Sequence, residues 1–507
     1  MKIVFAYILT LLILSNCAFG QTITYSTILR ADTKNMRFEI LGRFAENIIV
    51  YKNINKSNRL AVYDNNMALK ETIKLDYVSD NSINIDFIKY PDSAILFWQY
   101  EKGSITYCKA AKINGDGKLI GDVKFIDSTK VNFFGNKVMY TLTWSEDKSK
   151  ILMYKTISRN DTYTLVTKIY NDKFELQDST RGNYDFNNNR ESFTDLQIAN
   201  NGNFIFCKLK ENSREEYINT LEVHVKKYKE NTLKIVNVPL ADQLIQAPAV
   251  KIDNVNSFYL LSSFLYKKNR GTIEGLMQAT IDNTDIKLSQ KENTLFADSI
   301  IANLSGKPDW NNAFDNFILK NIILKKDGGF VLMAEEFIKQ RRFGNNFDNR
   351  FNNGFNNGTF FGNPNDFYLF NRGFNGYYRQ FDDVNGRDIT YNYNDIIVAV
   401  FSKTLQLQHA TVINKTASDV ETDNYLSFAN MVGGGEINFL FLQKDNNRQV
   451  LSRHALQANG SITRYPTVKS REAGYEFMPR LSRQTGLRQM IIPCLSKNSI
   501  AFAKIDF

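Results

Sequence analysis

The sequence contains few of the residues that build metal sites, disulfide frameworks and rigid turns. It has only 3 histidines, 4 cysteines and 8 prolines among 507 residues. The histidines, His224, His409 and His454, are far apart, and no two have the spacing of a metal-ligand pair. We therefore expect neither a metal site nor a cofactor.

Motifs for nucleophilic, phosphate and calcium chemistry are also absent. There is no Gly-x-Ser-x-Gly elbow and no glycine-rich phosphate loop of usual spacing. The run Asn114-Gly-Asp-Gly lacks the later glutamate of a calcium loop and predicts a tight turn instead. Adjacent Glu335 and Glu336 would point to opposite faces of a strand, so they cannot form an acid–base pair with each other. One of them could act only with a carboxylate from another part of the chain.

Beyond the N-terminus there is no apolar run of about 18 residues, so the sequence predicts no transmembrane helix. Residues 1–20 predict a signal peptide, with Lys2, a short apolar core and the cleavage site Ala18-Phe19-Gly20. Leu14-Ser15-Asn16-Cys17 also resembles a bacterial lipobox, so a lipid anchor on Cys17 stays open as the less favoured alternative. Both alternatives predict export, to the periplasm or the cell surface.

The chain has a net charge of +10, but its 63 basic residues are spread among 53 acidic ones. Because no basic tract follows a face or segment, we expect a solvated surface and no nucleic-acid partner. The predicted mature chain keeps Cys108, Cys207 and Cys494, each within an apolar run. We expect three buried free thiols, with one disulfide as the alternative.

Short apolar strands are abundant, in a chain with 38 phenylalanines and 25 tyrosines. One pattern returns eight times: an apolar strand, a polar turn, a more mixed second strand, another turn and a third strand. The apolar strands read as buried on both faces, because they do not alternate with polar residues. They are Asn47–Tyr51, Ala94–Trp98, Lys150–Tyr154, Asn203–Cys207, Ser257–Leu261, Gly329–Met333, Asn438–Leu442 and Arg488–Ile492.

Repeated antiparallel sheets that are buried on both faces predict an all-β, β-propeller-like ring of seven or eight blades over residues 21–507. The strand at Thr22–Leu29 has no repeat of its own, and pairing it with the C-terminal segment would close the ring. Two β-sandwich domains that divide near residue 300 are the alternative. The one predicted helix spans Phe296–Leu304.

Residues 340–394 interrupt one β-hairpin with a low-complexity insertion rich in Asn, Phe, Gly and Arg. Asn and Gly disfavour regular structure, and single aromatic residues stand between them, so we expect a flexible but adhesive loop. The alternative is a tolerated expansion of a hairpin tip with no specific role. The candidate ligand-binding residues are Arg341, Arg342, Phe347, Arg350, Phe351, Phe355, Tyr377 and Tyr378.

The C-terminal part of the chain resembles a known group of proteins. An Asp327-Gly-Gly-Phe-Val-Leu-Met-Ala-Glu-Glu336 strand, a variable Asn/Tyr-rich loop, Tyr393–Val398 and Tyr425–Ala429 follow one another. This order resembles exported, uncharacterised β-repeat proteins of the Bacteroidota. The resemblance implies a propeller-like fold and export but no activity, and the third strand near Thr404–His409 departs from the group's usual pattern.

Together, these patterns predict a non-enzymatic exported scaffold or binding protein of the cell envelope, with an envelope protein or a glycan as partner. The alternative is a glycan- or peptide-active hydrolase with its site in the central channel. We expect aromatic and acidic residues clustered at the channel mouth if the alternative holds.

Overall fold

The chain folds almost entirely into β-strands. The computed structural model describes residues 21–130, 139–159, 161–185, 190–211, 218–246, 248–266, 273–297, 300, 303–304, 316–341, 389–420, 422–445, 448–468 and 474–507. Within these ranges there are 36 strands and one short 3-10 helix, η1 (Pro479–Leu481), and no helix there could span a bilayer. The predicted signal peptide lies outside the described residues, and so do residues 298, 299, 301 and 302 of the predicted helix at Phe296–Leu304.

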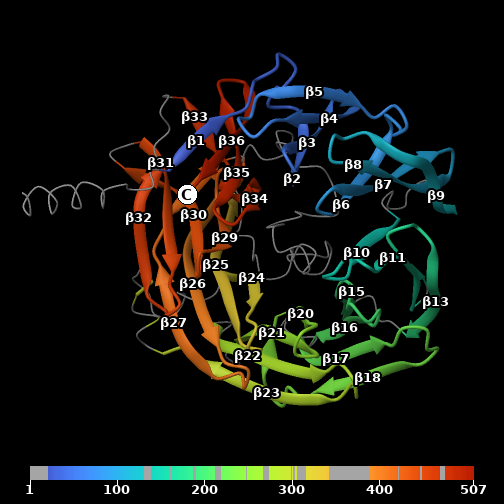
Figure 1. Ribbon diagram of the computed structural model, residues 1–507. Helices are drawn as coiled ribbons and strands as arrows, with labels where there is room; N and C mark the ends of the chain where they lie inside the picture. Colours follow the sequence, from blue (N-terminus) through green and yellow to red (C-terminus); the bar gives the residue numbers. More distant parts are fainter. Residues whose placement is uncertain are drawn as a thin grey trace, which may run out of the picture.

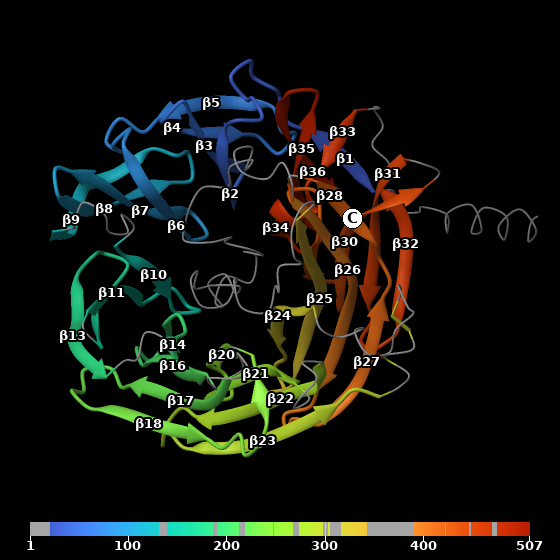
Figure 2. The same ribbon diagram turned by 180° about the vertical axis from the view of Figure 1, so that it is seen from behind.

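The sheets stand around a central axis as the blades of a propeller-like ring (Figures 1 and 2). The described residues form seven antiparallel sheets, and one of these, with ten strands, spans two blades. Blades 4 and 5 share that sheet because β19 (Leu244–Ile245) pairs with a strand of each. The ring therefore has eight blades, the larger of the two numbers predicted, and the two-sandwich alternative is wrong.

The first four blades follow chain order from the inner strand outward. Blade 1 contains β2 (Arg37–Phe44), β3 (Asn47–Ile54), β4 (Ser57–Tyr63) and β5 (Leu69–Lys74). Blade 2 contains β6 (Ser82–Lys89), β7 (Ser93–Lys102), β8 (Ile105–Asn114) and β9 (Leu119–Lys130). Blade 3 contains β10 (Thr141–Trp144), β11 (Ile151–Arg159), β12 (Thr162–Tyr170) and β13 (Leu176–Asp185). Blade 4 contains β14 (Glu191–Phe193), β15 (Gln197–Ile198), β16 (Phe204–Glu211), β17 (Ile218–Lys226) and β18 (Leu233–Val238).

The last four blades repeat this order, with additions in blades 6 and 8. Blade 5 contains β20 (Ala249–Asp253), β21 (Phe258–Tyr266), β22 (Ile273–Asp282) and β23 (Leu288–Leu295). Blade 6 contains β24 (Phe317–Leu324), β25 (Phe330–Arg341), β26 (Ile389–Phe401), β27 (Leu407–Ile413) and β28 (Ala417–Val420). Blade 7 contains β29 (Phe428–Gly433), β30 (Glu436–Asp445), β31 (Arg448–Leu456) and β32 (Ile462–Val468). Blade 8 contains β33 (Tyr475–Phe477), β34 (Arg483–Gly486), β35 (Gln489–Ser496), β36 (Ser499–Asp506) and β1 (Thr22–Tyr25).

The two ends of the chain meet in blade 8. Strand β1 pairs antiparallel with β36, from Thr22 opposite Asp506 to Tyr25 opposite Ala503, as the sequence predicted. The segment after β1 continues to blade 1, where the Asp32 carboxylate lies 2.7 Å from Lys52 Nζ and both side chains are buried. The N-terminal segment thus joins the last blade to the first.

The eight apolar runs found in the sequence are the second strands of the blades, not the first. The first six residues of β3 and the first seven of β7 are buried without interruption, because each of these strands has a neighbouring blade on both faces. An inner strand, or in blades 4 and 8 a pair of short strands, precedes each of them, and the sequence did not resolve these inner strands. The outer strand β5 shows the opposite burial and is mostly exposed.

A recurring turn joins the third and fourth strands of several blades. In blade 1 the Asp64 carboxylate accepts hydrogen bonds from the backbone N–H groups of Asn66 and Ala68. The next turn residue, Met67, has a positive φ of 59° and is fully buried. Leu405 repeats this arrangement in blade 6 with φ 62°. The left-handed backbone costs about 1–2 kcal/mol, and burial of the apolar side chain in the core offsets it.

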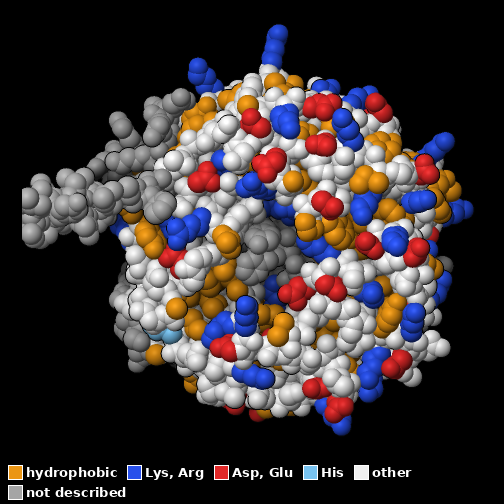
Figure 3. All heavy atoms as spheres, in the orientation of Figure 1, with side chains coloured by type: hydrophobic (Ala, Val, Ile, Leu, Met, Phe, Trp, Pro, Cys, Tyr) orange, Lys and Arg blue, Asp and Glu red, His pale blue; other side chains and the backbone are white. Residues whose placement is uncertain are grey.

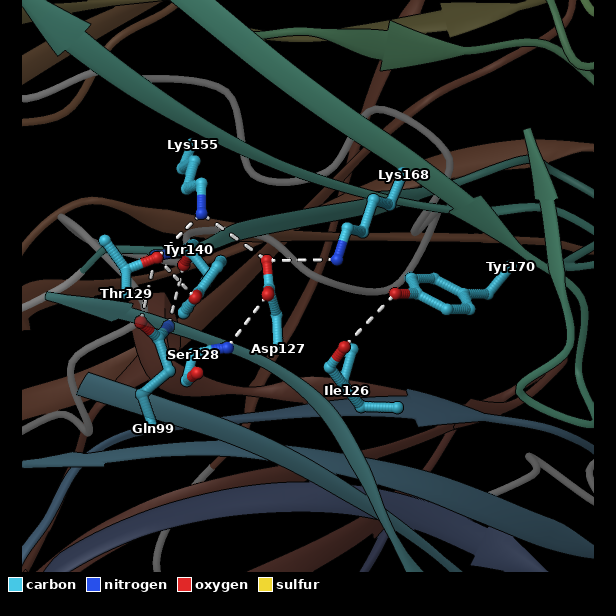
Figure 4. Close-up of polar contacts among 9 residues, drawn as sticks. All are labelled: Gln99, Ile126, Asp127, Ser128, Thr129, Tyr140, Lys155, Lys168 and Tyr170. Atoms are coloured by element: carbon cyan, nitrogen blue, oxygen red, sulfur yellow. Dashed lines mark hydrogen bonds and ion pairs between the residues drawn. The ribbon is translucent and has the colours of Figure 1, made fainter. Parts of the chain in front are cut away.

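Polar side chains also connect neighbouring blades, as in the seam between blades 2 and 3 (Figure 4). There, Asp127 of β9 lies 3.5 Å from Lys155 Nζ and 3.3 Å from Lys168 Nζ, both on blade 3. Gln99 of β7 donates to the Tyr140 carbonyl and accepts from the Tyr140 N–H. Both polar ends of the Gln99 amide are therefore used to hold the next blade.

Acidic and basic side chains are interspersed over the face seen in Figure 3, around a central opening. The three cysteines of the predicted mature chain, Cys108, Cys207 and Cys494, are buried and unpaired, as predicted. Burial raises the pKa of the Cys207 thiol to about 12, which keeps it protonated and unreactive at neutral pH.

Candidate functional site

The candidate site identified from the sequence lies on the β25–β26 hairpin of blade 6. The two strands pair from Phe330 opposite Phe401 to Arg341 opposite Ile389, which confirms the predicted hairpin. Residues 340–341 and 389–394, at the edges of the predicted insertion, are paired strand. Of the predicted binding residues, the structure describes only the backbone of Arg341, the last residue of β25. Arg342, Phe347, Arg350, Phe351, Phe355, Tyr377 and Tyr378 lie outside the described residues.

The end of this hairpin stands on an extension of blade 6. The short strand β28 pairs with β26 from Thr390 opposite Val420 to Tyr393 opposite Ala417, which adds a strand there. Beneath this extension, Phe337, Tyr393 and Leu426 form a separate small hydrophobic cluster. The rings of Tyr393 and Phe337 contact each other at a tilt of 40°, with centroids 4.7 Å apart. The hairpin end therefore has a core of its own, apart from the cores between the blades.

A fully buried carboxylate lies below this cluster. Glu335 of β25 is on the face of the strand that packs against blade 7, together with Val331 and Met333. Its Oε1 atom lies 2.9 Å from Lys415 Nζ, and its Oε2 atom lies 3.5 Å from Lys320 Nζ. Oε2 also accepts a hydrogen bond from Ser427, which begins blade 7. Two lysines of blade 6 and a hydroxyl of blade 7 thus compensate one buried charge.

The two lysines come from irregular positions of blade 6. Lys320 is the extra residue of a β-bulge in β24, and its Nζ lies 5.5 Å from the centroid of the Tyr393 ring. Burial lowers the pKa of Lys320 to about 8, although the charge of Glu335 acts in the opposite direction. Lys415 follows β27 and also donates to the Tyr393 carbonyl at 2.7 Å. Both lysines therefore contact Tyr393, the residue of β26 that pairs with Ala417 of β28.

A second ion pair ties the extension to blade 8. The Tyr393 hydroxyl donates to Asp423 at 3.0 Å, and Asp423 also forms an ion pair with Arg480 of η1. Asp423 belongs to the connection between blades 6 and 7, whereas η1 is part of blade 8. The base of the hairpin is consequently held by three consecutive blades.

This arrangement is suited to rigid support and not to acid–base chemistry. The Glu335 carboxylate is fully buried between the ammonium groups of Lys320 and Lys415, so it is not accessible to a substrate. Glu336 is half-buried, and its pKa is raised by burial. The two glutamates lie on different sides of β25, as the sequence predicted, and only Glu335 belongs to the ion network.

Sequence reasoning missed the lysines, Ser427 and Arg480. One signal for Lys320 was available, because a single lysine interrupts the apolar run Phe317-Ile-Leu-Lys-Asn-Ile-Ile-Leu324. A charged residue at such a position must find a buried partner. Nothing in the sequence identified that partner, because Ser427 lies 92 residues from Glu335.

No family model and no curated protein matches the sequence. Among solved structures, the polysaccharide lyase Uly1 is similar at 9% identity and a TM-score of 0.37, over 83% of this chain and 89% of that one. The β-propeller domain of the Trilobed protease from Pyrococcus furiosus is similar at 10% identity and a TM-score of 0.37, over 84% and 97%. Prolyl oligopeptidase B from Galerina marginata is similar at 10% identity and a TM-score of 0.39, over 92% of this chain but only 56% of that chain. At such scores these similarities carry no argument about activity.

Proposed function

We propose that this chain is an exported, non-enzymatic scaffold or binding protein of the cell envelope, which engages its partner through the segment mounted on the β25–β26 hairpin. The observation that carries the proposal is the support under that hairpin. Glu335 joins it to blade 7, and Asp423 and Arg480 join it to blade 8. A hairpin that only tolerated an expansion would not require its base to be fastened to two further blades.

The sequence of the mounted segment agrees with a binding role. Residues 342–388 alternate Phe and Tyr with Arg, Asn and Gly. Aromatic rings and guanidinium groups are enriched at the energetic centres of protein interfaces. The glycan-active form of the hydrolase alternative requires a pair of catalytic carboxyl groups. The first candidate for that pair, Glu335, is already bound by two lysines.

The experiment is a cross-linking capture from the cell envelope with three forms of the protein. The first is the intact chain. The second replaces residues 342–388 by an Asn-Gly turn, which can close the hairpin because Arg341 and Ile389 are paired. The third keeps the length of the segment but changes its Arg, Phe and Tyr residues to Ser.

We expect one partner that the intact chain captures and that both altered forms lose, while all three keep the same melting temperature. Recovery of the same partners by all three forms would contradict the proposal. The deletion stops at residue 388 because removal of Tyr393 would also disrupt the hydrophobic cluster and the Asp423 contact.

A further inference from the structure

The outermost strand of each blade has a free edge at the rim of the ring, and most of these rim strands carry features that obstruct further pairing. In β5, β9, β13, β23, β27 and β32, the described pairing with the neighbouring strand contains a register shift. Strand β32 also contains Pro466, which has no backbone N–H group. The rim strands β1 and β28 have only four residues each. Bulges, prolines and short lengths are the usual protection of an exposed sheet edge.

In three of these rim strands an aspartate also engages a backbone donor. The carboxylates of Asp127 in β9, Asp178 in β13 and Asp419 in β28 each accept a hydrogen bond from the N–H group of the next residue. The donor–acceptor distances are 2.9, 2.8 and 2.7 Å. A backbone donor that is held by its own strand in this way is not offered to another strand.

Strand β18, at the rim of blade 4, has none of these protective features (Figures 1 and 2). Its six residues pair with β17 without a register shift, from Leu233 opposite Lys226 to Val238 opposite Leu221. The strand reads Leu-Lys-Ile-Val-Asn-Val and contains no proline, glycine or acidic residue. Four of its side chains are apolar, and three of these are β-branched, which favours strand pairing. Within the described part of the chain, β17 is its only strand partner.

The side chains of β18 are partly open to solvent. Ile235, in the middle of the strand, is apolar and yet 53% exposed. Lys234 is the one charged residue of the strand, and its ammonium group lies 3.4 Å from the Asp285 carbonyl oxygen. Leu233 and Val236 are half-buried. A regular apolar edge with an exposed isoleucine at its centre is a template for another strand.

The order of residues in β18 favours a second copy of the same chain as that strand. Two copies that pair antiparallel about a two-fold axis keep the same sheet face on the same side, so opposed residues must lie on the same face. Pairing centred on Ile235 meets this condition: Ile235 lies opposite Ile235 of the second copy, and Lys234 lies opposite Val236. The exposed isoleucine is then covered, and the two lysines are not direct partners. A foreign strand selected by charge would find only Lys234 to recognise.

We propose that β18 is a homodimer interface, at which two copies of the chain pair edge to edge and join their blade 4 sheets. Backbone hydrogen bonds supply the affinity in such strand additions. Six paired residues bury less than the roughly 800 Å² that each partner contributes to a standard stable interface, so we expect a weak, reversible dimer. The proposal goes beyond the proposed function, because it involves no residue of the β25–β26 hairpin.

The test is sedimentation velocity of the mature chain, residues 21–507, between about 1 and about 100 µM. Two substitutions are compared with it: Ile235→Lys, which places like charges opposite each other at the two-fold axis, and Phe125→Lys. Phe125 is the matched control, because it is a 61% exposed apolar residue on the rim strand β9, whose pairing has two register shifts. The form in which an Asn-Gly turn replaces residues 342–388 is measured in parallel.

We expect the intact chain to dimerise with a Kd below about 100 µM. Ile235→Lys should raise this Kd at least tenfold, whereas Phe125→Lys and the form without residues 342–388 should stay within twofold. Because both substituted side chains are more than half exposed, the variants should keep the melting temperature of the intact chain, which is measured first. The form without residues 342–388 separates the dimer from the proposed hairpin function, so that either can fail alone.

Three results would overturn the proposal. The first is a chain that stays monomeric up to about 100 µM. The second is a dimer that persists in Ile235→Lys, or that is lost in Phe125→Lys or without residues 342–388, which would place the contact elsewhere. The third is an envelope protein that is captured by the intact, monomeric chain and lost in Ile235→Lys, which would assign β18 to a foreign strand.

Discussion

Glu335 and Asp195 are carboxyl groups at two seams of one ring, and their surroundings differ in kind. Glu335 is fully buried between blades 6 and 7 and has two lysines and a serine hydroxyl around it. Asp195 is half-buried between blades 3 and 4 and has one tyrosine hydroxyl on one oxygen. Three polar partners hold the Glu335 carboxylate, whereas within the described residues a single hydrogen bond holds the Asp195 side chain. The comparison therefore separates a seam held by an ion network from a seam held by one hydrogen bond to a carboxyl group.

The largest effect is expected for Glu335, the carboxylate with two lysines and a serine hydroxyl around it. Glu335→Gln leaves Lys320 and Lys415 buried without their counter-charge, and we expect a loss of about 3–5 kcal/mol in the free energy of unfolding. Urea denaturation followed by tryptophan fluorescence measures this loss. Glu336→Gln is the matched control, since Glu336 is half-buried and outside the ion network, and its loss should stay below about 1 kcal/mol. Equal losses in the two variants would refute the structural role of Glu335.

A triple variant tests whether charge or shape holds the seam between blades 6 and 7. Replacement of Glu335, Lys320 and Lys415 by Leu, Met and Met removes all three charges at once. Because the cost of burying ions disappears together with their attraction, we expect most of the lost stability to return. A triple variant as unstable as Glu335→Gln would show that shape, and not charge, holds the seam.

The next effect is the pH dependence of Asp195. Its pKa is raised from 3.8 to about 6, so the folded chain holds this proton more tightly than the unfolded chain. The resulting stabilisation is complete below pH 3.8 and is lost as the pH rises towards 6, by at most about 3 kcal/mol. Asp195→Asn should therefore match the intact chain near pH 4 and exceed it in stability at pH 7. Parallel stability curves from pH 4 to pH 7 would show that Asp195 titrates normally.

A smaller loss is expected at the seam of Figure 4. Lys155 and Lys168 have side-chain exposures of 16% and 25%, so water can solvate them when Asp127 is neutralised. Asp127→Asn should cost only about 1 kcal/mol, near the upper limit for exposed ion pairs. Its dependence on salt provides a check, since the difference from the intact chain should shrink in 1 M NaCl. A loss as large as that of Glu335→Gln would remove the distinction between the seams.

The smallest effect concerns an uncharged pair at the seam between blades 5 and 6. Ser262 and Gln278 face each other across β21 and β22, and both are fully buried. Among the described residues, no group forms a hydrogen bond with either side chain. The double replacement Ser262→Ala and Gln278→Leu should raise the free energy of unfolding by about 0.5–1 kcal/mol, because buried polar atoms without partners are costly. A measured decrease would mean that bound water satisfies both groups.

The repeat, and the burial of one strand in each unit on both faces, could be predicted from the sequence because both depend on a pattern of neighbouring residues. A strand that has a blade on each face must be apolar at consecutive positions, as β3 and β7 are, and this pattern is visible within a few residues. Eight such runs predicted the blade number to within one. Some inner strands escaped prediction because they are short: β15 has two residues and β14 three. Longer ones, such as β2, contain charged residues between the apolar ones.

The candidate sites depended on contacts that no local pattern contains. The sequence identified the unusual composition of residues 340–394, and the structure showed that its edges belong to paired strands of blade 6. Glu335 meets Ser427 across 92 residues, and Tyr154 meets Asp195 across 41. By itself, the sequence determined an all-β repeat chain with one exceptional hairpin, because burial on two faces and loop composition are local properties. Only the closed ring decided which buried charges are compensated and which carboxyl group has a single polar partner among the described residues, because those contacts form when distant blades pack together.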